Sequence, residues 1–309
     1  MLSAKSFARL ARPEYFLRPA QVARRLWRET YSETSESATV RLPWGLDIHV
    51  DPREAIGRAL VSQGLYEPLV TEALWRLTSP GDLAVDAGAN IGYMTCIFAS
   101  RTGASGKVYC FEPHPDVFRQ LQENVLNWQS RKKCGAIQLF AAGLGERDAL
   151  GELCVPDDFS ANRGTSSVDS NSSGNSGALR VRILCLDRMI ESPLVIAVMK
   201  IDVEGNELAV LAGMQRNLQQ RRVRNIIFEE FGAFPAPAHR FLQTHGYSIF
   251  GLEKRLRGIR LVANGAPDSR STELSAPNYL ATSEPELASR RLQSGMWESF
   301  GPARLFDWG

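Results

Sequence analysis

Long apolar runs are missing from this 309-residue chain, and so are the usual export signals. No segment approaches the roughly 18 consecutive apolar residues that a membrane-spanning helix requires. The N-terminus is basic, with Lys5, Arg9 and Arg12, but no uninterrupted apolar stretch follows, as a secretory signal peptide would need. The sequence therefore predicts a cytoplasmic protein without a transmembrane segment.

Cysteine is also scarce, and its spacing excludes two kinds of cross-linked domain. Zinc sites use cysteine pairs at short spacing, and disulfide frameworks use an even, regularly spaced set. The chain has no CxxC pair and an odd number of cysteines, so we expect reduced, mostly buried thiols and no zinc site. Asp202 and Glu204 are the alternative ligands for a divalent metal, but no ligand spacing demands one, so we expect no metal site. The cysteines are Cys96, Cys110, Cys134, Cys154 and Cys185.

A large excess of one charge is absent as well. The formal net charge is +2, whereas dedicated nucleic-acid binders carry a strong basic excess, so no nucleic-acid partner is expected. Basic residues do gather in residues 1–38, where residues 20–31 have the spacing of a short helix. That helix either packs on the domain or presents a patch to anionic lipid, as in peripheral membrane contact, or to an anionic acceptor.

What the sequence does contain is a regular alternation of strand and helix. Residues 39–51 predict a β-hairpin, and residues 53–78 have helical spacing that is interrupted near Gly64. From Asp82 onward, strands alternate with helices, which predicts a parallel sheet with right-handed crossovers. The predicted strands are 83–90, 107–113, 136–145, 194–205, 225–231, 247–253 and 278–282, and the predicted helices are 92–100, 116–128, 206–220 and 237–245.

One insertion interrupts this alternation. Residues 157–178 are rich in Ser, Asn and Gly and predict a flexible loop, and the strand-like segments 151–156 and 179–187 flank it as a hairpin. We divide the chain into a basic extension with a hairpin (1–52), one domain (53–285) and a C-terminal tail (286–309).

The first strand–helix junction has the pattern of a ligand-binding turn. In open α/β sheets, ligands bind outside the carboxyl ends of the strands. Gly88 lets the backbone turn without a Cβ, Asn90 tolerates positive φ, and Gly92 allows close packing at the start of the helix. The free N–H groups of that helix favour an anionic ligand group. Asp86 at the strand end either meets a ligand amino group or fixes the loop.

Glu112 strengthens this interpretation. It ends the second strand, 24 residues after Gly88, at about the distance where an acidic residue accepts hydrogen bonds from ribose hydroxyls. The alternative is a favourable charge near the N-terminus of the next helix. The turn lacks the G-x-G-x-x-G of dinucleotide folds, because Asn90 stands where the middle glycine would be. This favours a nucleoside that carries a small amino acid over a dinucleotide.

A second acidic group follows the fourth strand, at residues 200–207. The fourth strand is expected beside the first, so Asp202 and Glu204 should face the same crevice as Gly88. Strand alternation places Lys200 on their side. Their candidate roles are cofactor contact, acceptor positioning and proton removal. The alternative is helix capping, which we prefer for Glu207.

Together these segments resemble the FkbM-type methyltransferases. The resemblance covers about residues 45–282 and rests on an ordered set of motifs: GLYEP at 64–68, VDAGANIGYMT, GKVYCFEPHPDVFRQLQENV, KIDVEGNE, NIIFEEF and NYLAT. It implies a Rossmann-like class I methyltransferase fold, with a mostly parallel seven-stranded sheet and helices on both faces. It also implies S-adenosylmethionine as cofactor and O-methylation of a small-molecule, sugar, glycolipid or polyketide hydroxyl.

The resemblance also assigns candidate site residues. By position, the residues that carry over as cofactor-site residues are Asp86, Gly88, Asn90, Gly92, Glu112 and Asp202. Tyr66 and Glu67 look like part of the cofactor pocket, although packing and helix capping explain them nearly as well. Ala89, Tyr93, Pro113 and Ala142 complete the set. The catalytic candidates for proton removal are Asp202 and Glu204, with Glu229 and His49 behind them. His114 stands where family members often have Asn, and it either contacts the ribose or adenine or, as we prefer, lies on the surface.

Three other functions fit parts of the pattern. An NAD-dependent oxidoreductase would need the missing G-x-G-x-x-G turn. A methyltransferase-like module that binds without turnover would not need the acidic residues. A nucleic-acid methyltransferase would need an Asn-Pro-Pro-aromatic motif, which the chain lacks. The acceptor and the oligomeric state do not follow from the sequence.

Overall fold

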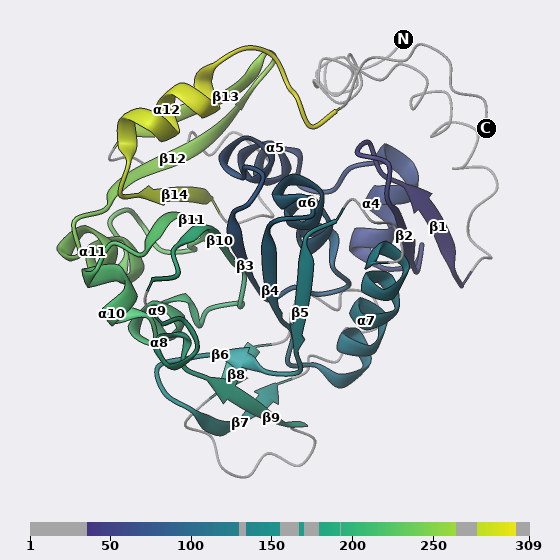
Figure 1. Ribbon diagram of the computed structural model, residues 1–309, viewed down its shortest axis with the longest axis horizontal. Helices are drawn as coiled ribbons and strands as arrows, with labels where there is room; N and C mark the ends of the chain where they lie inside the picture. The colour runs from purple at the N-terminus through teal and green to yellow at the C-terminus, as the bar shows by residue number, and fades with distance from the viewer. Residues whose placement is uncertain are drawn as a thin grey trace.

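An eight-stranded sheet forms the centre of the molecule (Figure 1). The computed structural model describes residues 36–129, 134–154, 167–169, 179–191, 193–263 and 277–300. Across the sheet the strands run β13 (Gly258–Ala263), β12 (Ser248–Arg255), β14 (Asn278–Thr282), β11 (Val223–Glu229), β10 (Ile196–Ile201), β3 (Leu83–Ala87), β4 (Lys107–Phe111) and β5 (Ala136–Phe140).

The sheet is mixed, with more strands than the seven expected. β11, β10, β3, β4 and β5 pair in parallel, and β14, β12 and β13 add antiparallel pairs on one side. β10 lies directly beside β3, as predicted for the fourth strand. The additional strand is β13, which forms because β12 continues to Arg255 and the chain turns back through Gly258 at φ +137°.

Two apolar clusters cover the two faces of the sheet. Successive strand residues point to opposite faces, so Ala84 joins one cluster while Leu83 and Val85 join the other. The first cluster packs against α4 (Ala55–Gln63), α5 (Pro68–Leu77), α6 (Tyr93–Thr102), α7 (Pro115–Gln129) and α12 (Pro285–Gln293). The second packs against α8 (Leu186–Met189), α9 (Glu207–Ala212), α10 (Gln215–Gln219) and α11 (Pro237–Thr244). The expected three-layer arrangement is therefore present (Figure 1).

The predicted helix at 206–220 is two helices. α9 ends at Ala212 and α10 begins at Gln215. Gly213 lies at the break, where an added Cβ would stand 1.9 Å from the carbonyl oxygen of Gly145. The apolar spacing continues through Gly213 and therefore does not reveal the break. The contact that requires a glycine there comes from Gly145, in a distant segment.

Both predicted hairpins are present. β1 (Ala38–Arg41) pairs antiparallel with β2 (Asp47–Val50), and β7 (Ala149–Cys154) pairs antiparallel with β9 (Leu179–Leu184). β6 (Gly143–Leu144) and β8 (Ser167–Asp169) complete a four-stranded sheet, which follows the carboxyl end of β5 and lies at the bottom of Figure 1. β8 falls within the stretch predicted as a flexible loop, so that prediction was wrong at residues 167–169. The rest of that loop and the helix at 20–31 lie outside the described residues.

The segment assigned to the C-terminal tail packs on the domain as far as residue 300. α12 buries Ala288 and Leu292, and Trp297 and Phe300 are buried beyond it. Arg76 on α5 holds this segment. Its guanidinium, whose side chain is 2% exposed, pairs with Glu72 and donates hydrogen bonds to the carbonyl oxygens of Arg291, Ser294 and Met296. We call Glu72 and Arg76 the α5 pair.

The α5 pair is completed by backbone donors. The carboxylate of Glu72 accepts the N–H groups of Glu298 and Ser299, each at 2.8 Å. The buried charges are therefore paired with each other and with backbone groups, as buried ions must be. The consequence is a fixed connection between the C-terminal segment and α5.

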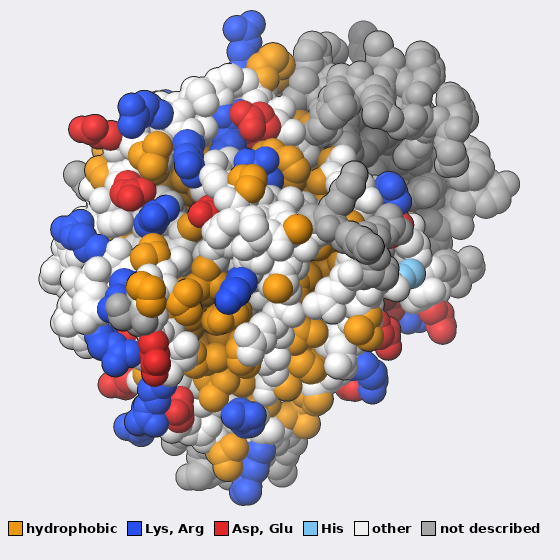
Figure 2. Space-filling view, viewed as in Figure 1, with side chains coloured by type: hydrophobic (Ala, Val, Ile, Leu, Met, Phe, Trp, Pro, Cys, Tyr) orange, Lys and Arg blue, Asp and Glu red, His pale blue; other side chains and the backbone are white. Residues whose placement is uncertain are grey.

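Part of the molecular surface is apolar. Figure 2 shows hydrophobic side chains gathered in the middle and lower part of one face, with charged side chains mainly around them. In the part of the chain that the structure describes, no helix is both long enough and apolar enough to cross a bilayer.

Candidate active site

The first β–α corner is tightly joined to the loop after β10. Gly88 has φ +81°, and a Cβ added there would lie 1.8 Å from the carbonyl oxygen of Asp202. The N–H of Asp202 in turn donates to the carbonyl oxygen of Ala87 at 2.9 Å. Asn90 and Gly92 also have positive φ, at +50° and +97°. Asn90 therefore has the positive φ that the sequence allowed, Gly92 is closely packed as expected, and only glycine fits at Gly88.

Glu112 lies against this corner. Its carboxylate oxygens accept the N–H groups of Asn90 and His114, both at 2.9 Å, and the residue is 7% exposed. Burial raises the pKa of Glu112 to about 7. The N–H of Gly88 donates to the carbonyl oxygen of Phe111 at 3.0 Å. The strand tip and the glycine turn thus meet, as the spacing predicted.

Asp86 is buried at the end of β3. One carboxylate oxygen, Oδ2, accepts the hydroxyl of Thr95 at 2.6 Å. The other, Oδ1, is buried and has no hydrogen-bond partner among the described residues. Burial raises the pKa of Asp86 to about 6. A buried acceptor without a donor is costly unless a ligand supplies one.

A lysine stands at the centre of the acidic side chains. Lys200 on β10 is fully buried, and its Nζ lies 3.2 Å from Oδ2 of Asp202, whose side chain is 32% exposed. Glu67 and Glu229 also act on Lys200 by charge, and together with Asp202 they raise its pKa against the opposing effect of burial. Glu67 precedes α5 and Glu229 ends β11, so three elements converge on one cation.

Glu67 has an unusual backbone conformation for its residue type. Its φ is +42°, in the left-handed region that residues other than Gly, Asn and Asp rarely adopt. Its Oε2 atom is buried and finds no partner in the described part of the chain. Burial raises the pKa of Glu67 to about 8, although Lys200 opposes the shift. Strain of this kind is found at sites that a surrounding structure holds in place.

Tyr93 supports the loop that carries Glu67. Its hydroxyl accepts the N–H of Tyr66 at 3.2 Å and lies 3.1 Å from the hydroxyl of Thr71. Its ring packs edge-on against that of Tyr66, with centroids 5.9 Å apart. Tyr93 is itself buried, so in this structure it supports the loop that carries Tyr66 and Glu67.

The loop after β10 separates the roles of its two glutamates. Glu204 has φ +50°, and burial together with Asp202 raises its pKa to about 7. Glu207 begins α9 and accepts the N–H of Gly205 at 3.0 Å. Glu207 therefore has the structural contact that the sequence favours, while the chemical role of Glu204 stays a prediction.

The remaining candidates divide between the corner and more distant positions. Ala89 donates its N–H to the carbonyl oxygen of Phe111 at 2.9 Å, and Ala142 is buried just beyond β5. Pro113 lies between Glu112 and His114 in the loop before α7. His49 is exposed on β2, and its Nδ1 lies 2.8 Å from the hydroxyl of Thr39. The contacts of His49 therefore lie away from the acidic side chains.

The expected surface position of His114 was wrong. It is 5% exposed, and its Nδ1 accepts the N–H of Asp116 at 3.2 Å. The residue after Pro113 is drawn inward because Glu112 binds its N–H and α7 begins immediately after it.

A comparison with known proteins decides the family. The family model described as the methyltransferase FkbM domain matches residues 86–249, more than half of the chain. The chain belongs to the FkbM methyltransferase family. The match begins at Asp86 and includes Gly88, Glu112 and Asp202, so the FkbM resemblance is confirmed. It disfavours the oxidoreductase alternative.

Individual relatives are more distant. Hexuronic acid methyltransferase AglP of Haloferax volcanii is 33% identical over 140 residues, which cover 45% of this chain and 52% of AglP. The chain thus spans about half the length of this curated relative. Two solved structures have similar chains. The FkbM methyltransferase of Methylobacillus flagellatus is 16% identical with a TM-score of 0.39, and covers 74% of this chain and 52% of its own. A SAM-dependent O-methyltransferase of Thermotoga maritima is 11% identical with a TM-score of 0.40, over 82% and 80%.

One site residue of this FkbM chain was not foreseen. Asn278, at the start of β14, stands opposite Glu229 in the sheet register and donates its Nδ2 to Glu229 Oε1 at 3.2 Å. Its Oδ1 is buried without a partner among the residues described. The sequence does show a polar residue, Asn278, directly before the apolar residues of the NYLAT strand. Its partner Glu229 depends on an antiparallel strand pairing, which the local sequence pattern does not specify.

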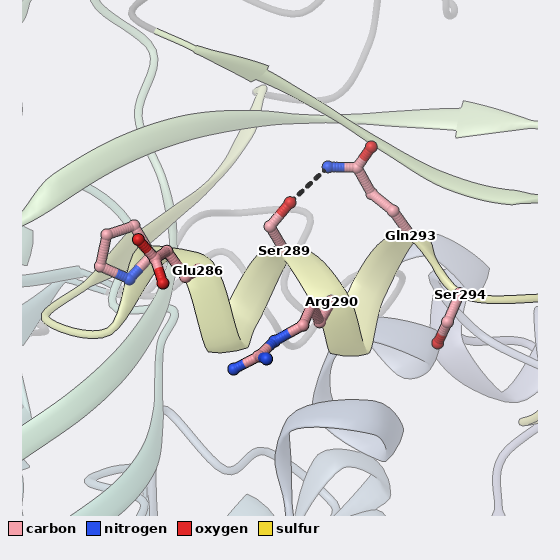
Figure 3. Close-up of a pocket in the computed structure, with 6 residues that line it drawn as sticks. Glu286, Ser289, Arg290, Gln293 and Ser294 are labelled. Atoms are coloured by element: carbon pink, nitrogen blue, oxygen red, sulfur yellow. Dashed lines mark hydrogen bonds between the residues drawn. The ribbon is translucent and has the colours of Figure 1, made fainter.

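Neither a metal site nor the groove on α12 coincides with the acidic side chains around Lys200 in the described part of the chain. No group of three or more His, Cys, Asp and Glu side chains in that part of the chain is arranged to hold a metal ion. A shallow groove on α12 is lined by side chains from Pro285 to Ser294, with a 2.7 Å hydrogen bond between Ser289 and Gln293 (Figure 3). None of its lining residues belongs to the acidic site.

The raised carboxyl pKa values predict how stability depends on pH. The ordinary pKa of Glu is 4.5, whereas Glu67 in the folded chain has a pKa of about 8 and Glu112 about 7. The folded state therefore binds more protons than the unfolded state between these values, so the free energy of unfolding falls as pH rises from about 4.5 to 8. Urea unfolding at pH 5.5 and pH 8 measures this fall, and Glu67→Gln should reduce it. An equal fall in that variant would contradict the contribution of Glu67.

Proposed function

We propose that this chain is an S-adenosylmethionine-dependent methyltransferase that methylates a hydroxyl of a saccharide or small molecule. Membership of the FkbM family establishes the methyltransferase relationship. The observation that carries the cofactor proposal is the contact between the glycine corner and Glu112, through Asn90 N and Glu112 Oε2 at 2.9 Å. The name of the AglP relative supports a saccharide acceptor.

The residues at the corner fit the proposed cofactor. A carboxylate has about four lone-pair positions, so Glu112 can accept ribose hydroxyls in addition to its two backbone donors. The partnerless Oδ1 of Asp86 provides an acceptor for the amino group of the methionine moiety. Asn90, Gly92 and Ala89 complete the corner. When bound, S-adenosylmethionine supplies an electrophilic methyl group on a sulfonium sulfur.

The chain's own contribution to transfer is positioning and proton removal. Holding the two reactants in line can lower a barrier by about 7–11 kcal/mol in favourable cases. The acceptor hydroxyl must lose its proton, and a nearby carboxylate can contribute roughly 10²–10⁴-fold by accepting it. Asp202 is partly exposed beside Lys200, and Glu204 follows it on the same loop. We assign proton removal to these two residues.

Titration of the purified protein with S-adenosylmethionine tests the proposal. We expect binding of S-adenosylmethionine and none of NAD⁺. Glu112→Ala should weaken the affinity by about 10–100-fold, because each hydrogen bond to a charged group contributes roughly 1.5–3 kcal/mol. Glu123→Ala, an exposed glutamate on α7, is the matched control and should leave the affinity unchanged.

A titration and a methyl-transfer assay of the same variant separate cofactor binding from proton removal. Glu204→Gln should keep wild-type affinity for S-adenosylmethionine while slowing methyl transfer, measured as S-adenosylhomocysteine formation. Tight binding of NAD⁺ alone, or unchanged affinity in Glu112→Ala, would overturn the cofactor assignment. Wild-type transfer by Glu204→Gln would remove the base role from Glu204.

A further inference from the structure

The β12–β13 hairpin carries a local excess of positive charge. Residues 253–260 contain four basic residues and one acidic residue, a net charge of +3, whereas the whole chain of 309 residues has a net charge of +2. Arg255, Arg257 and Arg260 are all exposed. The acidic residue, Glu253, pairs with Arg255 at 2.6 Å and with Arg260 at 3.7 Å. The hairpin therefore presents more guanidinium groups to its surroundings than its one carboxylate can balance.

Two large apolar side chains are exposed beside these charges. Leu256, at the turn of the hairpin, is 54% exposed, and Met296, which follows α12, is 52% exposed. Both neighbours of Met296 in the chain contact the turn. A Cβ added to Gly258 would lie 3.3 Å from the carbonyl oxygen of Gly295. The indole N–H of Trp297 donates to the carbonyl oxygen of Leu256 at 3.0 Å. The two apolar side chains therefore lie on one surface.

The C-terminal segment holds this turn in place. Trp297 is buried, and its indole N–H also lies 3.2 Å from the carbonyl oxygen of Arg255. The carbonyl oxygen of Met296 accepts a hydrogen bond from Arg76 of the α5 pair. Figure 1 shows the end of the hairpin beside the chain that leaves α12. Side chains on a turn that is already fixed lose less conformational freedom when they bind. We call Arg255, Leu256, Arg257, Arg260 and Met296 the hairpin patch.

The chemistry of the hairpin patch matches that of an anionic lipid surface. Basic side chains are attracted to the charged headgroups, and aliphatic side chains enter the boundary between headgroups and acyl chains. An anionic polymer such as a nucleic acid would bind the arginines but would offer no apolar phase to Leu256 and Met296. A single exposed apolar side chain is ordinary. Here two of them lie beside three exposed arginines, which favours the bilayer.

We propose that the hairpin patch docks the protein on the surface of an anionic lipid bilayer. Arg255, Arg257 and Arg260 bind the headgroup charges, and Leu256 and Met296 enter the boundary beneath them. The contact requires neither a bound cofactor nor methyl transfer. It therefore stands or falls independently of the proposed function.

Cosedimentation of the full chain with lipid vesicles tests the docking. One set of vesicles contains phosphatidylcholine alone, and the other contains three parts of phosphatidylcholine and one part of phosphatidylglycerol. We expect binding to the anionic set to be at least about tenfold stronger, because each basic side chain near an anionic leaflet contributes about fivefold. Added salt should weaken this binding, since it screens exposed charges.

Two variants assign the binding to the hairpin patch. Arg257→Gln combined with Arg260→Gln should weaken binding to the anionic vesicles by about 25-fold, which is about fivefold for each charge removed. Leu256→Ala should weaken it by about tenfold, because part of the hydrophobic contribution is lost. All three side chains are exposed, so circular dichroism should show a folded protein in each case.

Matched control variants carry the same changes elsewhere on the surface. Arg119→Gln combined with Arg188→Gln removes two exposed charges from α7 and α8, and Leu126→Ala shortens an exposed leucine on α7. Both controls should bind the anionic vesicles as the wild type does. Binding that falls equally in the controls and in the patch variants would contradict a specific role of the hairpin patch.

The basic N-terminal segment provides the competing explanation. Replacing Arg24, Arg25 and Arg28 together by Gln removes charge from that segment. Loss of binding there, with wild-type binding by Arg257→Gln combined with Arg260→Gln, would overturn the proposal. Absence of binding to the anionic vesicles, or equal binding to both sets, would overturn it as well. An effect of the arginines without any effect of Leu256→Ala would mean that the turn does not enter the bilayer, which also contradicts the docking proposed.

Discussion

Gly88→Ala is expected to abolish cofactor binding and to lower the free energy of unfolding by roughly 2–5 kcal/mol. The left-handed conformation costs an alanine about 1–2 kcal/mol, and overpacking adds about 1–3 kcal/mol. The new Cβ would stand 1.8 Å from the carbonyl oxygen of Asp202, so the corner and the loop after β10 must separate. That separation displaces Asn90 from Glu112. Urea unfolding and titration with S-adenosylmethionine measure the two effects.

Gly45→Ala distinguishes the clash from the backbone strain. Gly45 has a similar φ of +87°, but an added Cβ meets nothing within 4 Å. It lies in the β1–β2 turn, so its substitution should cost about 1–2 kcal/mol and leave cofactor affinity unchanged. If Gly88→Ala bound S-adenosylmethionine with wild-type affinity, the corner would not be the cofactor site.

Arg76→Met is expected to lower the free energy of unfolding by about 3–5 kcal/mol. Removing one partner of a buried ion pair leaves the other charge uncompensated. Here the carboxylate of Glu72 would remain buried, and three carbonyl oxygens of the segment 291–296 would lose their donor. Urea unfolding followed by circular dichroism measures the loss.

An exposed ion pair provides the comparison for Arg76→Met. Arg119 and Asp116 lie 3.0 Å apart on α7 with side chains 69% and 59% exposed. Exposed pairs contribute about 0–1 kcal/mol, so Arg119→Met should have little effect. Equal effects of the two substitutions would mean that the α5 pair does not hold the C-terminal segment as described.

The features predicted correctly from the sequence depend on local spacing or on strand order. Gly88 and Glu112 each directly follow the end of a strand, and parallel pairing of those two strands brings the ends together. The placement of β10 beside β3 follows from the order of strands in this fold class. The hairpins at 39–51 and around 157–178 follow from alternation and turn residues.

The features that were missed depend on contacts between distant segments. The partner of Asn278 is Glu229, 49 residues away, through an antiparallel pairing. His114 is buried by Glu112 and α7, although its local sequence resembles an exposed turn. The break at Gly213 is required by Gly145, across the inserted hairpin. Periodicity reports which face of an element is apolar and does not report which segment will cover it.

Glu67 and Asn278 lie outside residues 86–249, the segment that the FkbM family model matches. Both nevertheless act on side chains inside that segment, Glu67 on Lys200 by charge and Asn278 on Glu229 through a hydrogen bond. A fragment cut to the matched residues would therefore leave Lys200 and Glu229 without two of the groups that surround them in the whole chain.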